Sequence, residues 1–170
     1  MTSYVALLRG VNLGKRQLKM EDLRAIGEEL GLQAPRTYIA SGNLLFHSDE
    51  RETALKRALE SALTQHMGAP VGVVIRNADE LKAVAAKNPF ADQPGNRVVA
   101  IFLDHPPAPD AARCAKNLAG ERMALGEREI YVHYPSGQGV SKLKIPAAAD
   151  GTARNMNTVA KLAQLVRELE

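Results

Sequence analysis

The chain is poor in cysteine and in aromatic side chains. Its 170 residues include one cysteine, Cys114, no tryptophan, three phenylalanines and four tyrosines. A single thiol excludes an internal disulfide and a cysteine pair for a metal, which favours a reducing, cytoplasmic location. The scarcity of aromatic rings leaves little material for stacking nucleic-acid bases. These absences argue against a disulfide-rich secreted protein and against a dedicated nucleic-acid binder.

Long apolar segments and a strong charge bias are also missing. The nearest approach to a targeting segment is the apolar run at residues 4–8, which is too short to span a bilayer and lacks the features of a signal peptide. We therefore expect no membrane association. The 22 Lys and Arg residues exceed the 19 Asp and Glu residues only slightly, giving a net charge of +3, and they are dispersed. This charge permits an anionic ligand without requiring one.

The first half of the chain has the element order of a split βαβ unit. An apolar run over residues 4–9 predicts a buried, doubly covered strand, and the pattern over 20–30, ended by Gly31, predicts a helix. Short strand-like runs at 36–39 and 44–47 flank Ala-Ser-Gly-Asn, which is typical of a hairpin. A helix from 48 or 49 to 67 and a strand over 71–75 complete the order β-α-β-β-α-β.

The second half starts a similar cycle. Asn77 and Glu80 are spaced as a capping pair for a linking helix that closes at Pro89. A strand over 98–103, a weak helix over 111–118, a hairpin pair at 122–125 and 129–134 and an amphipathic final helix follow. The strand that would close the second unit is not identified.

From this order we expect an α/β (α+β) fold built from duplicated ferredoxin-like βαββαβ units. The sheets should be mostly antiparallel, with helices packed on them. The expected subdomains are residues 1–76 and 97–170, joined by a linking helix and loop at 77–96.

The loop after the first strand is the most informative candidate site. Strands one and three of a split βαβ unit are antiparallel neighbours, so this loop should share a sheet edge with the hairpin turn at 40–43. Backbone N–H groups at the start of the following helix also favour an anion there. The candidate ligands for a phosphate or carboxylate are Arg9, Asn12, Lys15, Ser41 and Asn43. Turn formation alone is the other explanation: Gly10, Gly14 and Gly42 permit tight turns, and the two asparagines can hydrogen-bond to the loop backbone.

A second basic cluster lies before or at the start of the final helix. It consists of Lys142, Lys144, Arg154, Asn155 and Asn157. Basic and amide side chains beside a helix N-terminus are typical of an anion site. Capping of the first helical turn is the alternative explanation for the asparagines, although it does not account for the lysines and the arginine.

Familiar catalytic motifs fail on inspection. A nucleotide P-loop needs four residues between its glycines and a hydroxyl after its lysine, but three residues separate Gly10 from Gly14 and Arg16 follows Lys15. Ser141 and Lys144 form S-x-x-K without the companion motifs of serine acyl-transfer enzymes. The four histidines show no metal-ligand spacing. The sequence therefore predicts no metal, no cofactor and no assignable catalytic residues, and whether the protein is an enzyme stays open.

Motifs along the whole chain resemble one family. YVALLRGVNLGK, TYIASGNLLF, NPF, YPSGQGVSKLK and TARNMNTVAKL are similar, in this order, to the signatures of the bacterial family Domain of Unknown Function 1697. The family usually has Gly-Gly where this chain has Gly14-Lys15, and Trp where it has Met156. The resemblance implies a duplicated ferredoxin-like fold and carries no established activity or catalytic residue. Its motifs fall on the same loops as the two candidate sites.

The favoured hypothesis is binding of a small anionic ligand, such as a nucleotide or a phosphorylated metabolite. Weak nucleic-acid binding through an open sheet face is an alternative, as is a non-catalytic protein-interaction module. A transferase or hydrolase acting on a phosphorylated compound ranks lower, because no nucleophile, base or metal set supports it. Exposed strand edges can pair across a two-fold axis, so monomer and homodimer are both open.

Overall fold

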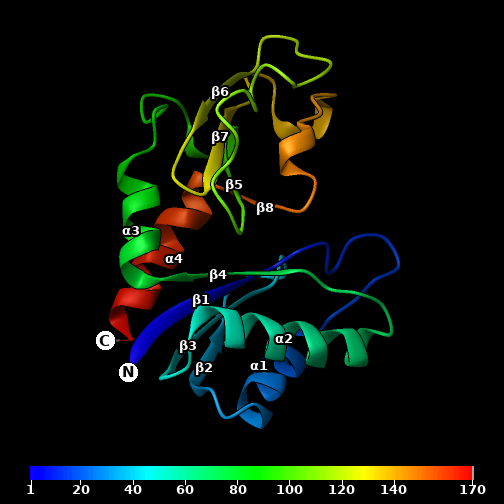
Figure 1. Ribbon diagram of the computed structural model, residues 1–170, viewed down its shortest axis with the longest axis vertical. Coiled ribbons are helices and arrows are strands. Elements are labelled where there is room, and N and C mark those ends of the chain that lie inside the picture. The colour runs from blue at the N-terminus through cyan, green and yellow to red at the C-terminus, as the bar shows by residue number, and fades with distance from the viewer. Residues whose placement is uncertain (170) are drawn as a thin grey trace. The chain divides into compact units, whose positions relative to one another are not determined.

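The computed structural model describes residues 1–169 and places two four-stranded antiparallel sheets and four α-helices within them (Figure 1). The chain divides into two compact units, Met1–Leu81 with the segment that starts at Leu162, and Lys82–Lys161. This division differs from the expected boundaries at 76 and 97. The difference arises because the final helix is divided between the two units at Leu162; Leu162, Leu165 and Val166, which follow this division, are buried.

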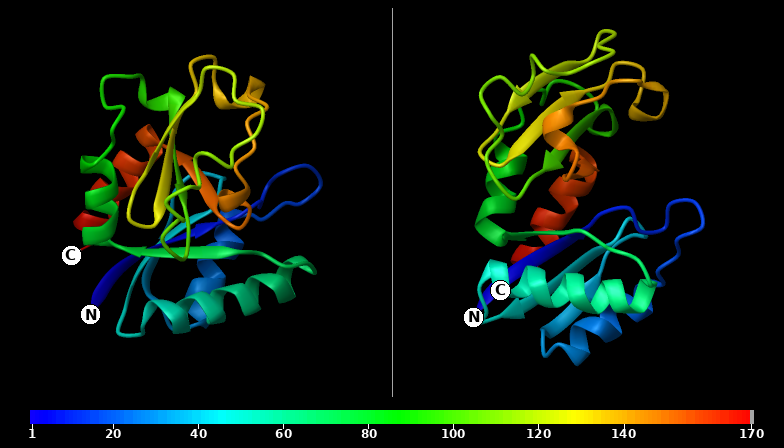
Figure 2. Two further views of the ribbon diagram at one scale, coloured as in Figure 1. Left: turned by 45° about the horizontal axis from the view of Figure 1, so that its top comes forward. Right: turned by 45° about the vertical axis from the view of Figure 1, so that its right-hand side comes forward.

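The first unit has the element order predicted from the sequence. It contains β1 (Thr2–Leu8), α1 (Met20–Glu29), β2 (Gln33–Thr37), β3 (Asn43–Ser48), α2 (Glu52–Met67) and β4 (Val73–Asn77). The strands lie in the order β2-β3-β1-β4, and every neighbouring pair is antiparallel. Figure 2 shows α1 and α2 side by side on one face of this sheet.

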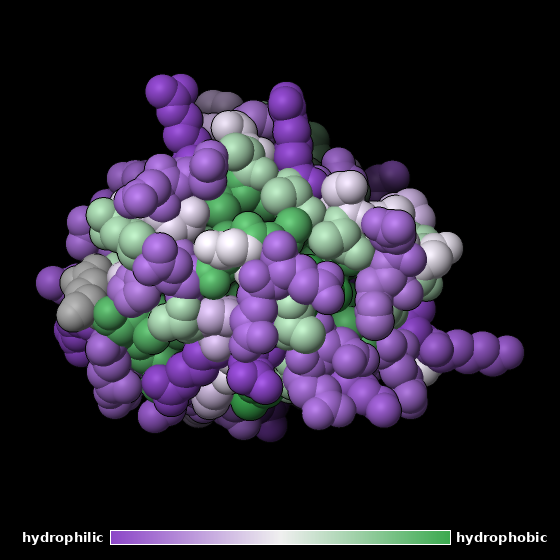
Figure 3. All heavy atoms as spheres, turned by 90° about the horizontal axis from the view of Figure 1, so that it is seen from below, coloured by the Kyte–Doolittle hydropathy of each residue, from purple (hydrophilic) through white to green (hydrophobic). Residues whose placement is uncertain are grey.

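The core of the first unit lies between its sheet and these two helices. Ala6 and Leu8 of β1 belong to the same buried cluster as Leu23 of α1 and Leu59 of α2. Val5 and Leu7 point to the other face, because strand side chains alternate, and they are buried as well. The strand is therefore covered on both faces, as its continuous apolar run predicts. The face of the molecule seen in Figure 3 is largely hydrophilic, with apolar side chains exposed only in patches.

The second sheet repeats the strand order of the first. The second half of the chain contains α3 (Ala78–Ala86), β5 (Val98–Phe102), β6 (Arg122–Leu125), β7 (Glu129–His133), β8 (Thr152–Asn155) and α4 (Met156–Glu168). The order β6-β7-β5-β8 places the four strands as β2-β3-β1-β4 are placed in the first sheet. The closing strand that the sequence did not reveal is β8, a short segment whose two buried residues, Thr152 and Arg154, are polar.

The predicted helix at 111–118 is wrong. This segment forms turns, and Ala111 is its one buried residue. An isolated helix of that length needs an apolar face to pack, and without one its backbone adopts other conformations. Asn117 has a left-handed φ of 61°, and Lys116 pairs with Lys144 in an isolated β-bridge, both of which are incompatible with a continuing helix. By contrast, the capping pair is confirmed: the N–H of Asn77 donates to Glu80 Oε1 and the N–H of Glu80 donates to Asn77 Oδ1.

Tyr131 of β7 makes the stability of the fold depend on pH. Its hydroxyl donates to the carbonyl of Val84 in α3 at 2.8 Å, and burial, followed by the charges of Glu129 and Glu127, raises its pKa to about 12. A raised folded-state pKa means that the stabilisation is complete below the unfolded value of 10.0 and is lost as the pH rises through 12. We expect a loss of about 3 kcal/mol across this window. Denaturant titrations from pH 9 to 12 should show about 2 kcal/mol more loss in the native protein than in Tyr131→Phe, in which Tyr134, whose pKa is also raised, still titrates. An equal loss in both would contradict the assignment.

Candidate functional site

The loop after β1 and the turn before β3 meet at one end of the first sheet. Leu7 pairs with Asn43, and the N–H of Leu8 donates to the carbonyl of Gly42 at 2.9 Å. The N–H of Arg9 then donates to the carbonyl of Gly72, which adds the segment before β4 to the same rim. The predicted adjacency of Arg9 and Ser41 is therefore confirmed. We call residues 9–16 and 40–43 at this rim the loop site.

The asparagines of the loop site hold its backbone. Asn12 Oδ1 accepts the N–H of Leu18 at 2.6 Å, and its Nδ2 donates to the carbonyls of Leu18 and Ala40 at 3.0 and 2.7 Å. Asn43 is fully buried, and its Nδ2 donates to the carbonyl of Tyr38 and to Ser41 Oγ. Both side chains stabilise the loops, which is the turn-chemistry explanation that the sequence left open.

Three cationic side chains come from the opening loop. Arg9 and Lys15 are exposed, and the stem of Arg9 lies beside Gly72. Arg16, which sequence reasoning used only to reject a P-loop, is half-buried, and its Nη2 donates to the carbonyl of Pro70 at 2.8 Å. Its Nε is buried without a hydrogen-bond partner among the described residues. Arg16 is thus fixed against the rim by the segment that precedes β4.

The loop site carries no acidic residue of its own. The three segments that meet there, residues 9–20, 36–43 and 68–73, contain no aspartate and no glutamate. Cationic side chains in segments that lack carboxylates favour an anion, and the carboxylate that does reach the third segment, Glu60 of α2 at Val73, is paired with Lys56. The lack of acidic residues in each segment can be read from the sequence, but only the sheet register brings the three segments together.

The residues of the second predicted cluster come from two segments of the second half of the chain. Arg154 and Asn155 end β8, directly before α4, as the prediction requires, whereas Lys142 is exposed in the loop after β7. The Asn155 side chain caps α4 by accepting the N–H of Thr158, and Asn157 lies against the backbone of Gly95. The strand at 152–155, which the sequence did not reveal, is what leads Arg154 and Asn155 to the start of α4.

Arg154 has a structural environment that its counterpart in the first unit shares. Its Nη1 donates to Thr152 Oγ1 at 2.8 Å and to the carbonyl of Ala153, and burial lowers its pKa to about 10. Arg76 of β4 is also buried and donates to the carbonyl of Ile75. Each arginine is followed by an asparagine that caps the next helix. The repeated Arg-Asn pair is a sequence sign of the duplication that was missed.

Lys142 lines a pocket of about 530 Å³ beside the loop that follows β7. Glu121, which sequence reasoning missed, accepts hydrogen bonds there from Ser141 Oγ and from the N–H of Ala119, both at 2.6 Å. These bonds, Ser141 first, lower the pKa of Glu121, so the carboxylate is charged at neutral pH. Burial, followed by the charge of Glu121, raises the pKa of Tyr134 in the same pocket. The carboxylate makes this pocket a poor place for a second anion.

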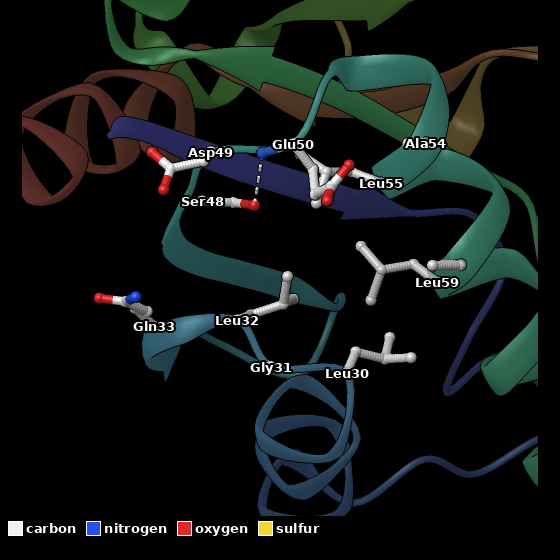
Figure 4. Close-up of a pocket in the computed structure, with 11 residues that line it drawn as sticks. Leu30, Gly31, Leu32, Gln33, Ser48, Asp49, Glu50, Ala54, Leu55 and Leu59 are labelled. Atoms are coloured by element: carbon white, nitrogen blue, oxygen red, sulfur yellow. Dashed lines mark hydrogen bonds between the residues drawn. The ribbon is translucent and has the colours of Figure 1, made fainter.

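A further pocket, of about 460 Å³, lies at the opposite rim of the first sheet (Figure 4). Leu32, Leu55 and Leu59 supply its apolar lining, while Asp49 and Glu50 stand at its polar side. Ser48 Oγ accepts the N–H of Glu50, shown as the dashed line in Figure 4. The acidic rim does not suit a phosphate.

Neither a metal-binding group nor a membrane-spanning helix is present in the part of the chain that the structure describes. Among residues 1–169, no group of three or more His, Cys, Asp and Glu side chains is arranged to hold a metal ion. Within the same range, no helix is both long enough and apolar enough to cross a membrane.

Comparisons with known proteins agree with the fold. The structure is similar to that of the conserved bacterial protein SP0830 from Streptococcus pneumoniae, with a TM-score of 0.82 and 26% sequence identity over 98% of this chain and 99% of that one. No curated protein matches the chain. The family model described as a protein of unknown function, DUF1697, matches residues 1–131. The chain therefore belongs to the DUF1697 family.

Proposed function

We propose that the protein binds a small phosphate-bearing ligand at the loop site. The observation that carries this proposal is the gathering of Arg9, Lys15 and Arg16 at a rim whose three segments lack carboxylates. The loop is held in advance by Asn12, so little conformational entropy is lost when a ligand binds. Guanidinium and ammonium groups are the side chains that recognise phosphate oxygens.

The distribution of aromatic rings favours a small ligand over a nucleic acid. Single-stranded nucleic acids bind to exposed aromatic side chains on which successive bases stack. All three phenylalanines are buried here, as are Tyr131 and Tyr134. Tyr4 and Tyr38 are half-buried, and the Tyr4 ring stacks on Phe46 with centroids 5.8 Å apart. No aromatic side chain in residues 1–169 offers an exposed stacking platform.

The proposal also includes the type of fold and the cellular location. The common strand order of the two sheets supports a ferredoxin-like description of both units. The single cysteine supports a cytoplasmic location, where thiols stay reduced.

Inorganic pyrophosphate is a suitable probe for the loop site. We expect saturable binding by isothermal titration calorimetry that weakens as salt rises, because exposed charges are screened. Lys15→Gln should weaken the binding roughly threefold to tenfold, and the Lys15→Gln/Arg16→Gln double variant more, since each removes a charge-assisted contact. Arg51→Gln is the matched control, because it removes an exposed cation at the start of α2, at the opposite rim. Equal affinity in the double variant and the native protein would refute the proposal.

A further inference from the structure

A separate hollow of about 430 Å³ lies at the end of β7, in the second unit. It is lined by Gln93, Pro94, Asn96, Arg97, His133 and Pro135. No carboxylate is among these lining residues, and the polar ones are side chains that can donate hydrogen bonds. None of these residues belongs to either candidate cluster predicted from the sequence. The sequence pattern bears on His133 only as a possible metal ligand.

His133 is the unusual member of this set. Its side chain is 7% exposed, and its Nδ1 is buried with no hydrogen-bond partner among the described residues. Its ring lies beside Phe90, with centroids 6.0 Å apart. Packing against Phe90 needs an aromatic ring and does not need an imidazole, so the core alone does not explain a histidine here, whose ring also lines the hollow. A bare Nδ1 is less costly than an unpaired N–H, which leaves the proton on Nε2 as a donor.

Arg97 is fixed in the wall of the same hollow. Its N–H donates to the carbonyl of Pro94, its own carbonyl accepts the N–H of Tyr134 at 2.8 Å, and its Nη1 donates to the carbonyl of Pro135 at 2.7 Å. A guanidinium has five N–H donors, and the bond to Pro135 uses one of them. The side chain is therefore oriented while donors remain for a ligand. Asn96, which is exposed, adds an amide beside it.

We propose that this hollow is a second anion site, which takes a compact oxyanion of a small molecule, a phosphate or a carboxylate group, on Arg97, His133 and Asn96. A buried imidazole donor and a fixed guanidinium supply directional hydrogen bonds and one full positive charge without a competing carboxylate in the lining. The site is independent of the loop site, since its residues all belong to the second unit. We expect the bound group to be small, because the donors are few: Asn96 and Arg97 lie just before β5, and His133 ends β7.

Titration of the full-length protein with inorganic phosphate, and separately with acetate, tests this site by NMR. The ring resonances of His133 and the Nε–Hε signal of Arg97 should shift with saturation, with a dissociation constant on the order of 1 mM for so few contacts. Saturation by phosphate alone identifies a phosphate site, and saturation by both identifies a general oxyanion site. Shifts that grow linearly with both anions, without saturation, would overturn the proposal.

Variants separate this site from the loop site. Arg97→Gln and His133→Phe should each weaken phosphate binding tenfold or more at the hollow, while loop-site signals respond as in the native protein. Asn96→Ala, at an exposed position, should weaken it about threefold and serves if either of the others fails to fold. Arg113→Gln, which removes an exposed cation of the same unit, is the control. Native affinity in Arg97→Gln, or in Asn96→Ala together with a folded His133→Phe, would overturn the assignment.

Discussion

Replacing Gly42 by alanine is expected to lower the free energy of unfolding by about 3 kcal/mol, through the combined cost of a left-handed backbone and an overpacked contact. Gly42 has a φ of 93°, a conformation that residues with a Cβ rarely adopt. An added Cβ would also lie 2.7 Å from Val11 Cγ2 and 2.9 Å from Leu8 Cβ. Neither neighbour is free to move, because Leu8 and Val11 are buried. Denaturant unfolding of the purified variant measures the change.

Gly14→Ala is the matched control for this prediction. Gly14 belongs to the same rim and has a φ of 60°, but no atom lies within 4 Å of an added Cβ. Its replacement should therefore cost only the backbone strain, about 1 kcal/mol. The difference between the two variants isolates the steric contact beneath the turn. If the two variants were equally stable, the contact of an added Cβ with Leu8 and Val11 would not contribute to the loss of stability at Gly42.

Asn12→Ala is expected to lower the free energy of unfolding by about 2 to 3 kcal/mol, because it removes three hydrogen bonds that span the opening loop. The N–H of Leu18 and the carbonyls of Leu18 and Ala40 would each lose their side-chain partner. The loop would then be ordered only on binding, so we also expect weaker pyrophosphate binding although every cation is retained. Calorimetry and denaturant unfolding of one preparation give both values.

Asn117→Ala controls for the backbone conformation of Asn12. Asn117 has nearly the same left-handed φ, 61° against 58°, but it is exposed, and no side-chain hydrogen bond is assigned to it in residues 1–169. Its replacement should cost about 1 kcal/mol or less, and pyrophosphate binding should be unchanged. If Asn12→Ala were no more destabilising than Asn117→Ala, the hydrogen bonds of Asn12 would contribute nothing to the loop.

The two candidate clusters show how far a sequence reaches toward a site. The adjacency of Arg9 and Ser41 could be predicted because the order of strands in a βαββαβ unit follows from chain connectivity. The strand that carries Arg154 could not be predicted, because the four residues of β8 have no apolar run. In the structure Arg154 is buried and donates to Thr152 of its own strand, whereas Lys142 lines the pocket beside the loop after β7.

The sequence by itself determined the fold class, the strands of the first unit and the rim at which its opening loop lies, because continuous apolar runs, hairpin turns and chain connectivity are local or topological properties. Only the tertiary structure decided that Asn12 and Asn43 serve the loop backbone, that Arg16 joins the rim, and that His133 is buried with an unpaired nitrogen. Those facts depend on which atoms lie within about 3 Å of one another across the sheet, the range of a hydrogen bond. A residue's type and spacing do not record that distance.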